Sequence, residues 1–188
     1  MDKTRLIIEL EGLFRRENFI GDEMAGIFLQ RIKDGRLTKE ENSKSHLCAY
    51  FAAHDSKAKQ VFIGHHKKSG LWLFNGGHID GDETIKEALN REIKEEWGLD
   101  GNDFKISLPE FLTITEIDNP TKQPCNFHFD LWCFVAVDKN NFVPSEARLF
   151  EEFHEYGWKN LDEARNLAES NKNMLSAIDF IEKNYFKK

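Results

Sequence analysis

Three glutamates with the chemistry of a metal site lie in one predicted helix. Glu92, Glu95 and Glu96 are spaced i, i+3 and i+4, and residues at these spacings are neighbours on a helix surface. On the helical wheel Glu92 and Glu96 project into the apolar stripe, where burial is expected. Two carboxylates about 6 Å apart repel by roughly 3 kcal/mol at an effective dielectric near 20, so a partly buried cluster requires a cation. Carboxylate oxygens suit Mg²⁺ or Mn²⁺.

The helix that carries these glutamates has recognisable start and stop signals. The segment 82–84, Asp-Glu-Thr, supplies capping and dipole-complementing groups. The helix is predicted to run to about Trp97, with Gly98 as its left-handed stop. Just before it, Gly76 and Gly77 permit close approach of the backbone to a ligand. The alternative interpretation is a glutamate-rich helix that is only solvated.

The whole stretch from Gly76 to Leu99 fits a longer pattern. Gly77, Glu83, the run Arg91-Glu92-Ile93, the pair Glu95-Glu96 and the pair Gly98-Leu99 match the Nudix box at every defined position. The sequence therefore resembles the Nudix hydrolases, the superfamily that includes MutT. The resemblance covers roughly residues 46–185. It implies an α/β/α sandwich with a mixed sheet, whose loop-helix-loop motif binds a divalent metal and hydrolyses a diphosphate linkage. One departure is Asn75, which stands where many boxes have proline.

The resemblance also implies roles for individual residues. Glu95 and Glu96 correspond to metal ligands, with the Gly76 carbonyl completing the set. Glu92 corresponds to a metal ligand or to the base that activates water, and Arg91 with Glu83 to an orienting ion pair. In related enzymes the base comes from a distant loop instead. The candidates for that alternative base here are Glu146, Glu151 and Glu152.

Composition limits the classes of partner. The chain has 188 residues, a net charge of -7 and 31% charged residues. An acidic chain is a poor ligand for long nucleic acid, which is bound by many Lys and Arg contacts to phosphate. Cys48, Cys125 and Cys133 lack C-x-x-C spacing, so neither a disulfide framework nor a zinc site is favoured, and buried free thiols are expected. No apolar run approaches the length of a membrane span, so we expect a cytoplasmic protein.

The first 45 residues differ in character from the rest. Apolar residues at helical spacing predict a helix from about Thr4 to Glu17 and a second helix that Asp22 caps and that ends near Gly35. Such a hairpin serves packing or oligomer formation, so a homodimer is one expectation. Residues 34–45 are polar and are interpreted as a linker. We therefore divide the chain into an N-terminal helical extension with linker, 1–45, and a Nudix hydrolase domain, 46–188.

The remainder alternates strands with helices. Strands are predicted near 46–53, 60–66, 71–74, 104–106, 111–117, 126–137 and 153–158. Residues 118–124 and 138–152 are predicted as loops, and Asp162 as the cap of terminal helical segments that reach Tyr185. Strands interspersed with helices indicate an α+β layered domain.

The strand 126–137 is the predicted substrate wall. Leu131 and Cys133 belong to its alternating core face, whereas the other face starts with polar groups and grades into aromatics. Hydrogen-bonding groups followed by rings are what a ligand cavity needs. The residues predicted to bind substrate are His128, Asp130 and Trp132, with Phe74. The alternative is an ordinary His-Asp pair near a sheet end.

A second polar feature precedes the box. The cluster 65–68, His-His-Lys-Lys, is either an exposed hairpin tip or a phosphate contact.

These observations predict a Mg²⁺-dependent or Mn²⁺-dependent hydrolase that cleaves a diphosphate linkage. The expected substrate is a small phosphorylated molecule in which a nucleoside diphosphate is linked to another moiety, such as a nucleotide sugar, an ADP-ribose-like compound or a nucleoside triphosphate. One alternative resembles isopentenyl-diphosphate isomerase, a family that needs a cysteine where Gly76 stands here. The other is a non-catalytic nucleotide-sensing domain, although such domains commonly lose the box carboxylates.

Overall fold

A mixed β-sheet is the centre of the fold. The computed structural model describes residues 4–117 and 125–186. Within them the strand order is β3-β2-β1-β6-β5, with β4 also pairing with β1 and β7 with β2. The parallel pair is β1 with β6, and the other pairs are antiparallel. The strands are β1 (Ser45–Asp55), β2 (Gln60–His66), β3 (Trp72–Leu73), β4 (Asn75–His78), β5 (Phe111–Glu116), β6 (Phe127–Ala136) and β7 (Phe153–Asn160).

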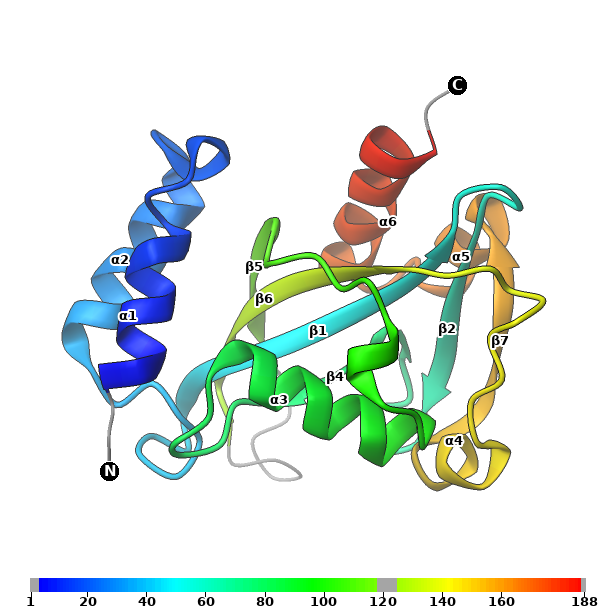
Figure 1. Cartoon of the computed structure of the whole chain (residues 1–188), viewed down its shortest axis with the longest axis horizontal. Helices are drawn as coiled ribbons and strands as arrows, with labels where there is room; N and C mark the ends of the chain where they lie inside the picture. The colour runs from blue at the N-terminus through cyan, green and yellow to red at the C-terminus, as the bar shows by residue number, and fades with distance from the viewer. Residues whose placement is uncertain (1–3, 118–124, 187–188) are drawn as a thin grey trace.

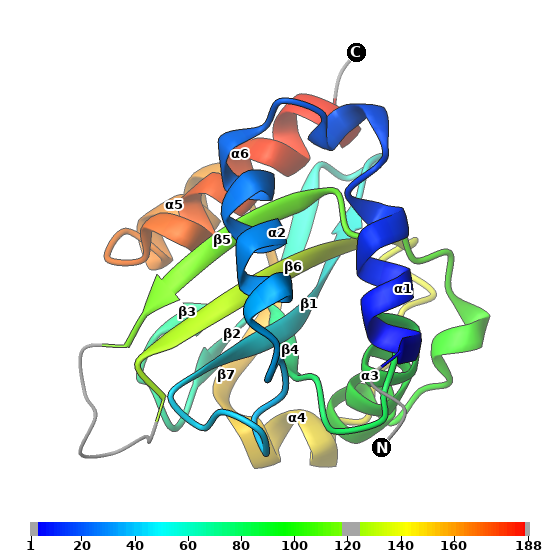
Figure 2. The same ribbon diagram turned by 90° about the vertical axis from the view of Figure 1, so that its left-hand side faces the viewer.

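Helices cover both faces of this sheet (Figure 1). They are α1 (Thr4–Leu13), α2 (Glu23–Asp34), α3 (Ile85–Glu92), α4 (Glu146–Glu152), α5 (Leu161–Leu167) and α6 (Lys172–Tyr185). Figure 2 shows α1 and α3 on one side of the sheet and α5 and α6 on the other. This is the predicted α+β sandwich, and the α/β/α layering is confirmed.

Two hydrophobic cores, one for each face, explain the alternation of residues along β6. Leu131 and Cys133 pack in the core that α1, α2 and α3 cover. Trp132 and Phe134 pack in the core that α5 and α6 cover, and the Phe134 ring stacks on Phe180 at 4.9 Å between centroids. The predicted core face is therefore confirmed. The opposite face of β6, predicted as a substrate wall, is also mostly buried, with Trp132 and Phe134 in the second core.

The N-terminal hairpin is built into the first of these cores. Phe28 of α2 meets Phe129 of β6 edge-on at 5.3 Å, and Asp22 caps α2 as predicted, because its side chain accepts from the Ala25 amide at 2.8 Å. The first helix ends at Leu13, earlier than predicted. Because the hairpin and the sheet share one core, the division at residue 45 stays a prediction.

The chain between 138 and 152 was predicted wrongly. It contains α4, whose start is capped by the Ser145 hydroxyl accepting from the Arg148 amide. Seven residues are too few for a clear periodic signal, which explains the error. The predicted strand at 104–106 is reduced to one bridge, between Ile106 and Val135. The predicted loop 118–124 lies outside the described residues.

The capping residues of two helices also differ from the prediction. The N-cap residue of α3 is Thr84, which forms a reciprocal capping box with Glu87. Asn160, two residues before the predicted Asp162, caps α5 in the same way with Glu163. In both cases the box pairs the cap with the third helical residue, which supplies two hydrogen bonds instead of one.

No helix in the described part of the chain is long and apolar enough to cross a bilayer. The cytoplasmic location expected from the sequence stays a prediction.

Candidate active site

The glycine loop and the glutamate helix meet in close contact. A Cβ atom on Gly77 would lie 2.0 Å from Glu92 Oε1, so only glycine leaves room for this carboxylate. A Cβ on Gly76, where φ is +154°, would lie 2.6 Å from the Ala49 carbonyl oxygen and would collide with the backbone of β1. The two glycines thus let β4 run between β1 and the Glu92 side chain.

The end of the glutamate helix is wider than an α-helix. Residues Ile93–Trp97 form a π-helical turn, and Gly98 ends it with φ +67°. The predicted extent to Trp97 and the left-handed glycine stop are confirmed, but the last turn is not α-helical. Single π turns inside α-helices are frequent at functional sites. Here the turn carries Glu95 and Glu96.

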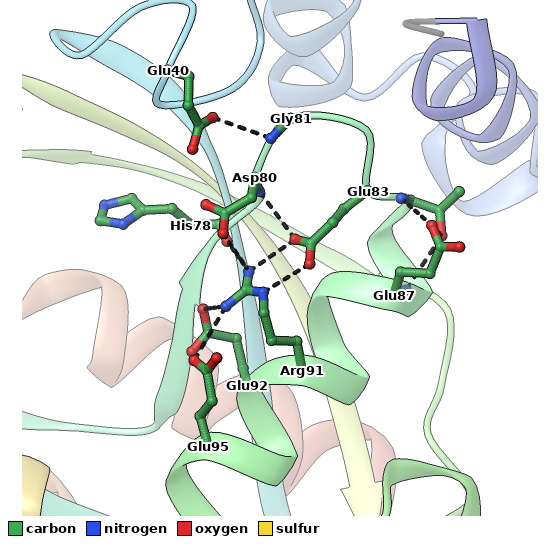
Figure 3. Close-up of polar contacts among 10 residues, drawn as sticks. Glu40, His78, Asp80, Gly81, Glu83, Glu87, Arg91, Glu92 and Glu95 are labelled. Carbon is green, nitrogen blue, oxygen red and sulfur yellow. Dashed lines mark hydrogen bonds and ion pairs between the residues drawn. The ribbon is translucent and has the colours of Figure 1, made fainter. Parts of the chain in front are cut away.

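Arg91 ties the helix to the loop that precedes it (Figure 3). Its guanidinium is bidentate to Glu83, with Nε to Oε1 at 2.7 Å and Nη2 to Oε2 at 2.8 Å. Nη1 donates to Glu92 Oε1 at 2.7 Å, and Nη2 also donates to the His78 carbonyl at 2.9 Å. These contacts join the Arg91 and Glu83 side chains, as expected of an orienting ion pair, and they fix one oxygen of Glu92.

Glu96 is the most perturbed of the three glutamates. It is 9% exposed, and burial raises the pKa of its carboxyl to about 8. Glu92 and Glu152 add to this increase, whereas hydrogen bonds from Asn75 and the Gly76 backbone oppose it. The Asn75 amide donates to Glu96 Oε2. Asn75, at the position where many boxes have proline, is therefore a supporting residue whose partner the sequence did not reveal.

The other two glutamates have different environments. Burial raises the pKa of Glu92, which the Arg91 ion pair partly offsets. The Glu95 side chain is 58% exposed and lies 3.4 Å from Arg91 Nη1. The three carboxylates thus form a gradient from buried to exposed across one helical turn.

All three line a pocket of about 870 Å³. Other predicted site residues that line it are Gly76, Phe74, His128, Trp132, Glu151 and Glu152. Three cationic side chains that the site prediction did not include, Lys39, Lys68 and Arg148, share the lining. Glu152 accepts from Lys68 Nζ at 3.2 Å and has His66 Nε2 within 3.6 Å. The basic cluster before the box therefore reaches the pocket.

The remaining predicted residues lie outside the pocket lining. Arg91 and Glu83 stand behind the glutamates, and Glu146 lies in the first turn of α4. Asp130 is fully buried, and its Oδ2 accepts from the hydroxyls of Thr113 at 2.9 Å and Thr115 at 2.6 Å. Its Oδ1 has no hydrogen-bond partner among the described residues. Asp130 thus lies outside the pocket lining, and its role as a substrate contact stays a prediction.

Comparison with known proteins agrees with this geometry. A family model described as NUDIX domain matches residues 44–178. The nucleoside triphosphatase NudI of Escherichia coli O139:H28 is 32% identical over 101 residues, which cover 47% of this chain and 61% of that protein. An RNA pyrophosphohydrolase of Campylobacter jejuni is 38% identical over 64 residues, covering 34% of this chain and 39% of that protein. The match thus spans less than two thirds of either relative.

Solved structures share the fold. The dihydroneopterin triphosphate pyrophosphohydrolase of E. coli superposes with a TM-score of 0.60 at 18% identity, covering 74% of this chain and 94% of that one. The Ap4A hydrolase of C. elegans superposes with a TM-score of 0.54 at 16% identity, covering 73% and 96%. Since the family model extends over most of the chain and the box residues occupy one helical turn beside a glycine loop, this chain belongs to the NUDIX domain family, that of the Nudix hydrolases.

Proposed function

We propose that the protein is a divalent-metal-dependent hydrolase that cleaves a diphosphate linkage in a small nucleotide-like substrate. The observation that carries this proposal is the shared pocket of Glu92, Glu95 and Glu96, with Glu96 buried beside Asn75. Because the pKa of this carboxyl is about 8, its ionised form is unfavourable at neutral pH unless a cation binds beside it.

The donor set suits Mg²⁺ or Mn²⁺. Glu92, Glu95 and Glu96, with the Gly76 carbonyl, would hold the ion, because hard oxygen donors are what these cations prefer. When bound, the ion supplies charge neutralisation at phosphate oxygens and lowers the pKa of water. Arg91 Nη1 donates to Glu92 Oε1 at 2.7 Å, so the orientation of the Glu92 carboxylate is set before any substrate enters.

The charges of the pocket support an anionic substrate only with a cation present. The lining carries five carboxylates, the three box glutamates with Glu151 and Glu152, against the three cations Lys39, Lys68 and Arg148. A polyphosphate would meet net repulsion from the protein alone. One divalent ion held by the glutamates would neutralise this excess of negative charge, so that the lysines and the arginine can pair with terminal phosphate oxygens.

We place the general base at Glu152. Glu92 has one oxygen already engaged by Arg91 and would serve as a metal ligand, so its carboxylate is not free to take a proton from water. Glu152 is the last residue of α4, the helix that packs against the π-helical turn. Its charge is near enough to raise the pKa of Glu96. Its role would be to take the proton of the attacking water.

The aromatic part of the pocket supports a nucleoside-like group. Tyr50 stacks on Trp132 at 4.5 Å between centroids, and both line the pocket with Phe74. The named activities of the relatives, a nucleoside triphosphatase and an RNA pyrophosphohydrolase, both concern phosphate chains on nucleosides. We therefore propose nucleoside triphosphates, nucleotide sugars and ADP-ribose-like compounds as the substrate class.

A substrate panel tests the proposal. Nucleoside triphosphates, dinucleoside polyphosphates, nucleotide sugars and ADP-ribose are incubated with Mg²⁺, with Mn²⁺ or with EDTA, and products are separated chromatographically. We expect metal-dependent hydrolysis that Glu96→Gln abolishes and that Glu169→Gln, a change on an exposed turn, leaves intact. Absence of any hydrolysis across the panel would refute the proposed hydrolase in favour of a non-catalytic nucleotide-sensing domain. Isomerisation of isopentenyl diphosphate, assayed separately, would favour the isomerase alternative.

A further inference from the structure

Three imidazoles and one thiol converge on one face of the sheet, beside the glutamates but separate from them. His46 and Cys48 are alternate residues of β1 and so point the same way. In the strand register His46 pairs with His128 of β6, and Cys48 pairs with His78 of β4. Three adjacent strands thus deliver four side chains to one place, and their ligand atoms all lie within 4.8 Å of one another.

The three rings form a triangle. Their centroids are separated by 4.6 Å for His46 and His78, 5.0 Å for His46 and His128, and 5.1 Å for His78 and His128. In a tetrahedral zinc site ligand atoms lie about 3.4 Å apart, since Zn–N is about 2.0 Å and Zn–S about 2.3 Å. The observed group, with ligand atoms within 4.8 Å of one another, is wider than this, so its side chains would move together on binding an ion.

An unsatisfied nitrogen points to a missing ligand. His128 is 8% exposed, and its buried Nε2 has no hydrogen-bond partner among the described residues. Leaving such a nitrogen unpaired in the interior is costly. A metal ion would use its lone pair.

A supporting contact orients His46. Its Nδ1 lies 2.9 Å from the Asn42 carbonyl oxygen, so Nδ1 carries the proton and Nε2 has the lone pair. The present neighbour of Nε2 is Cys125 Sγ at 3.7 Å, a weak contact that a metal ion would replace. A backbone carbonyl that accepts from the second nitrogen is the usual outer partner of a metal-bound histidine.

We propose that His46, Cys48, His78 and His128 form a transition-metal site that binds Zn²⁺, distinct from the oxygen site of the glutamates. Imidazole and thiolate donors select Zn²⁺ over Mg²⁺, whereas carboxylates favour the reverse. Binding converts the Cys48 thiol to a zinc-bound thiolate and releases its proton to solvent. Cys48, His78 and His128 line the pocket, which provides the entry path. The bound ion would clamp β4 to β1 and β6 next to Gly76.

Charges near the group act in both directions. Burial raises the pKa of the Cys48 thiol, and the nearby negative charges of Asp130 and Glu92 raise it further; the same negative charges favour a bound cation. The positive charge of Lys39 opposes the binding of a cation, because its Nζ lies 3.5 Å from His78 Nδ1. Lys39 is only partly buried, so its side chain has room to turn away when the ion enters. Replacing Lys39 should therefore tighten zinc binding, an effect that a merely structural histidine cluster would not show.

Cobalt substitution tests the site directly. The full chain is stripped with a chelator and titrated with Co²⁺ in the presence of excess Mg²⁺. We expect one Co²⁺ per chain, a visible spectrum of tetrahedral intensity and a sulfur-to-cobalt charge-transfer band, all displaced by Zn²⁺. Zinc binding should also raise the melting temperature. A spectrum without the sulfur band, or binding that excess Mg²⁺ abolishes, overturns the proposal because the ion then sits on the glutamates.

Two buried cysteines provide a matched comparison. Cys48 is 2% exposed and Cys133 is fully buried on the opposite face of the sheet, so Cys48→Ala and Cys133→Ala each remove a buried thiol. Cys48→Ala should remove the charge-transfer band and weaken Zn²⁺ binding at least about tenfold, whereas Cys133→Ala should retain both. Lys39→Gln should bind Zn²⁺ more tightly than the wild type. Equal binding by wild type and Cys48→Ala overturns the proposal.

Discussion

The buried glutamate gives the protein a pH-dependent stability that can be measured without any substrate. The pKa of Glu96 is about 8 in the folded protein against an ordinary value of 4.5. The folded state therefore holds a proton on Glu96 that the unfolded chain releases, so the contribution of this carboxyl to stability falls as pH rises from about 4.5 to about 8. At pH 7 the difference of 2.5 pH units corresponds to about 3 kcal/mol of lost stability, at about 1.36 kcal/mol per unit.

Glu96→Gln removes the titrating group and keeps an oxygen that can accept from the Asn75 amide. In EDTA, the free energy of unfolding of Glu96→Gln should exceed that of the wild type by about 3 kcal/mol at pH 7. The gap should be small at pH 4.5, where the carboxyl is half ionised in the unfolded chain, and should close below that pH, where it is protonated in both states. Urea unfolding at a series of pH values from 4 to 8 measures the difference. Other buried groups, such as Glu92 with a raised pKa and His54 with a pKa lowered by burial, are present in both proteins, so only the difference between the two curves reports on Glu96.

Two controls make the result specific. Glu95→Gln changes a carboxylate that is 58% exposed in the same turn, and its curve should follow the wild type in EDTA. Adding Mg²⁺ should stabilise the wild type but much less Glu96→Gln, because the ion replaces the proton on the carboxylate. If the free energies of unfolding of the wild type and Glu96→Gln differ by the same amount at every pH, the raised pKa of Glu96 is refuted.

Three substitutions test the supporting geometry. Gly77→Ala places a methyl 2.0 Å from Glu92 Oε1, so activity should fall at least about 100-fold while the melting temperature changes little. Arg91→Met leaves the largely buried carboxylates of Glu83 and Glu92 unpaired and should cost about 3 kcal/mol in urea unfolding. Glu152→Gln should lower kcat by about 100-fold or more with metal affinity retained, as measured by steady-state kinetics and Mn²⁺ titration.

Each of these has an opposing outcome. Unchanged kinetics in Gly77→Ala would mean that the Glu92 carboxylate need not sit over the loop. A loss below 1 kcal/mol in Arg91→Met would show that its ion pairs are effectively solvated. Retained turnover in Glu152→Gln would return the role of base to Glu92 or Glu151.

Local patterns were enough for the parts of the site that lie close together in the chain. The spacing of Glu92, Glu95 and Glu96 predicted a shared, partly buried helix face, and Gly98 predicted its end. These predictions succeeded because helix geometry relates residues three and four apart whatever surrounds them. The alternation along β6 was equally local, and it correctly assigned Leu131 to a core face.

Contacts between distant segments were beyond such reasoning. Glu9 of α1 accepts from the Ile85 amide at 2.7 Å, so the N-terminal hairpin helps to cap the glutamate helix, 76 residues away in sequence. The sequence predicted Asp130 as a pocket residue, because the pattern of its own strand does not show that Thr113 and Thr115 of the neighbouring strand bond to it.

The sequence by itself determined the glutamate turn, its glycine loop and the type of chemistry they support, because those residues are contiguous. Only the tertiary structure decided what stands next to them. The cysteine spacing argued against zinc, yet the pairing of β1 with β4 and β6 places Cys48 among His46, His78 and His128. Strand register brings together residues from three separate segments, and no periodicity within any one of them encodes which neighbours it will meet.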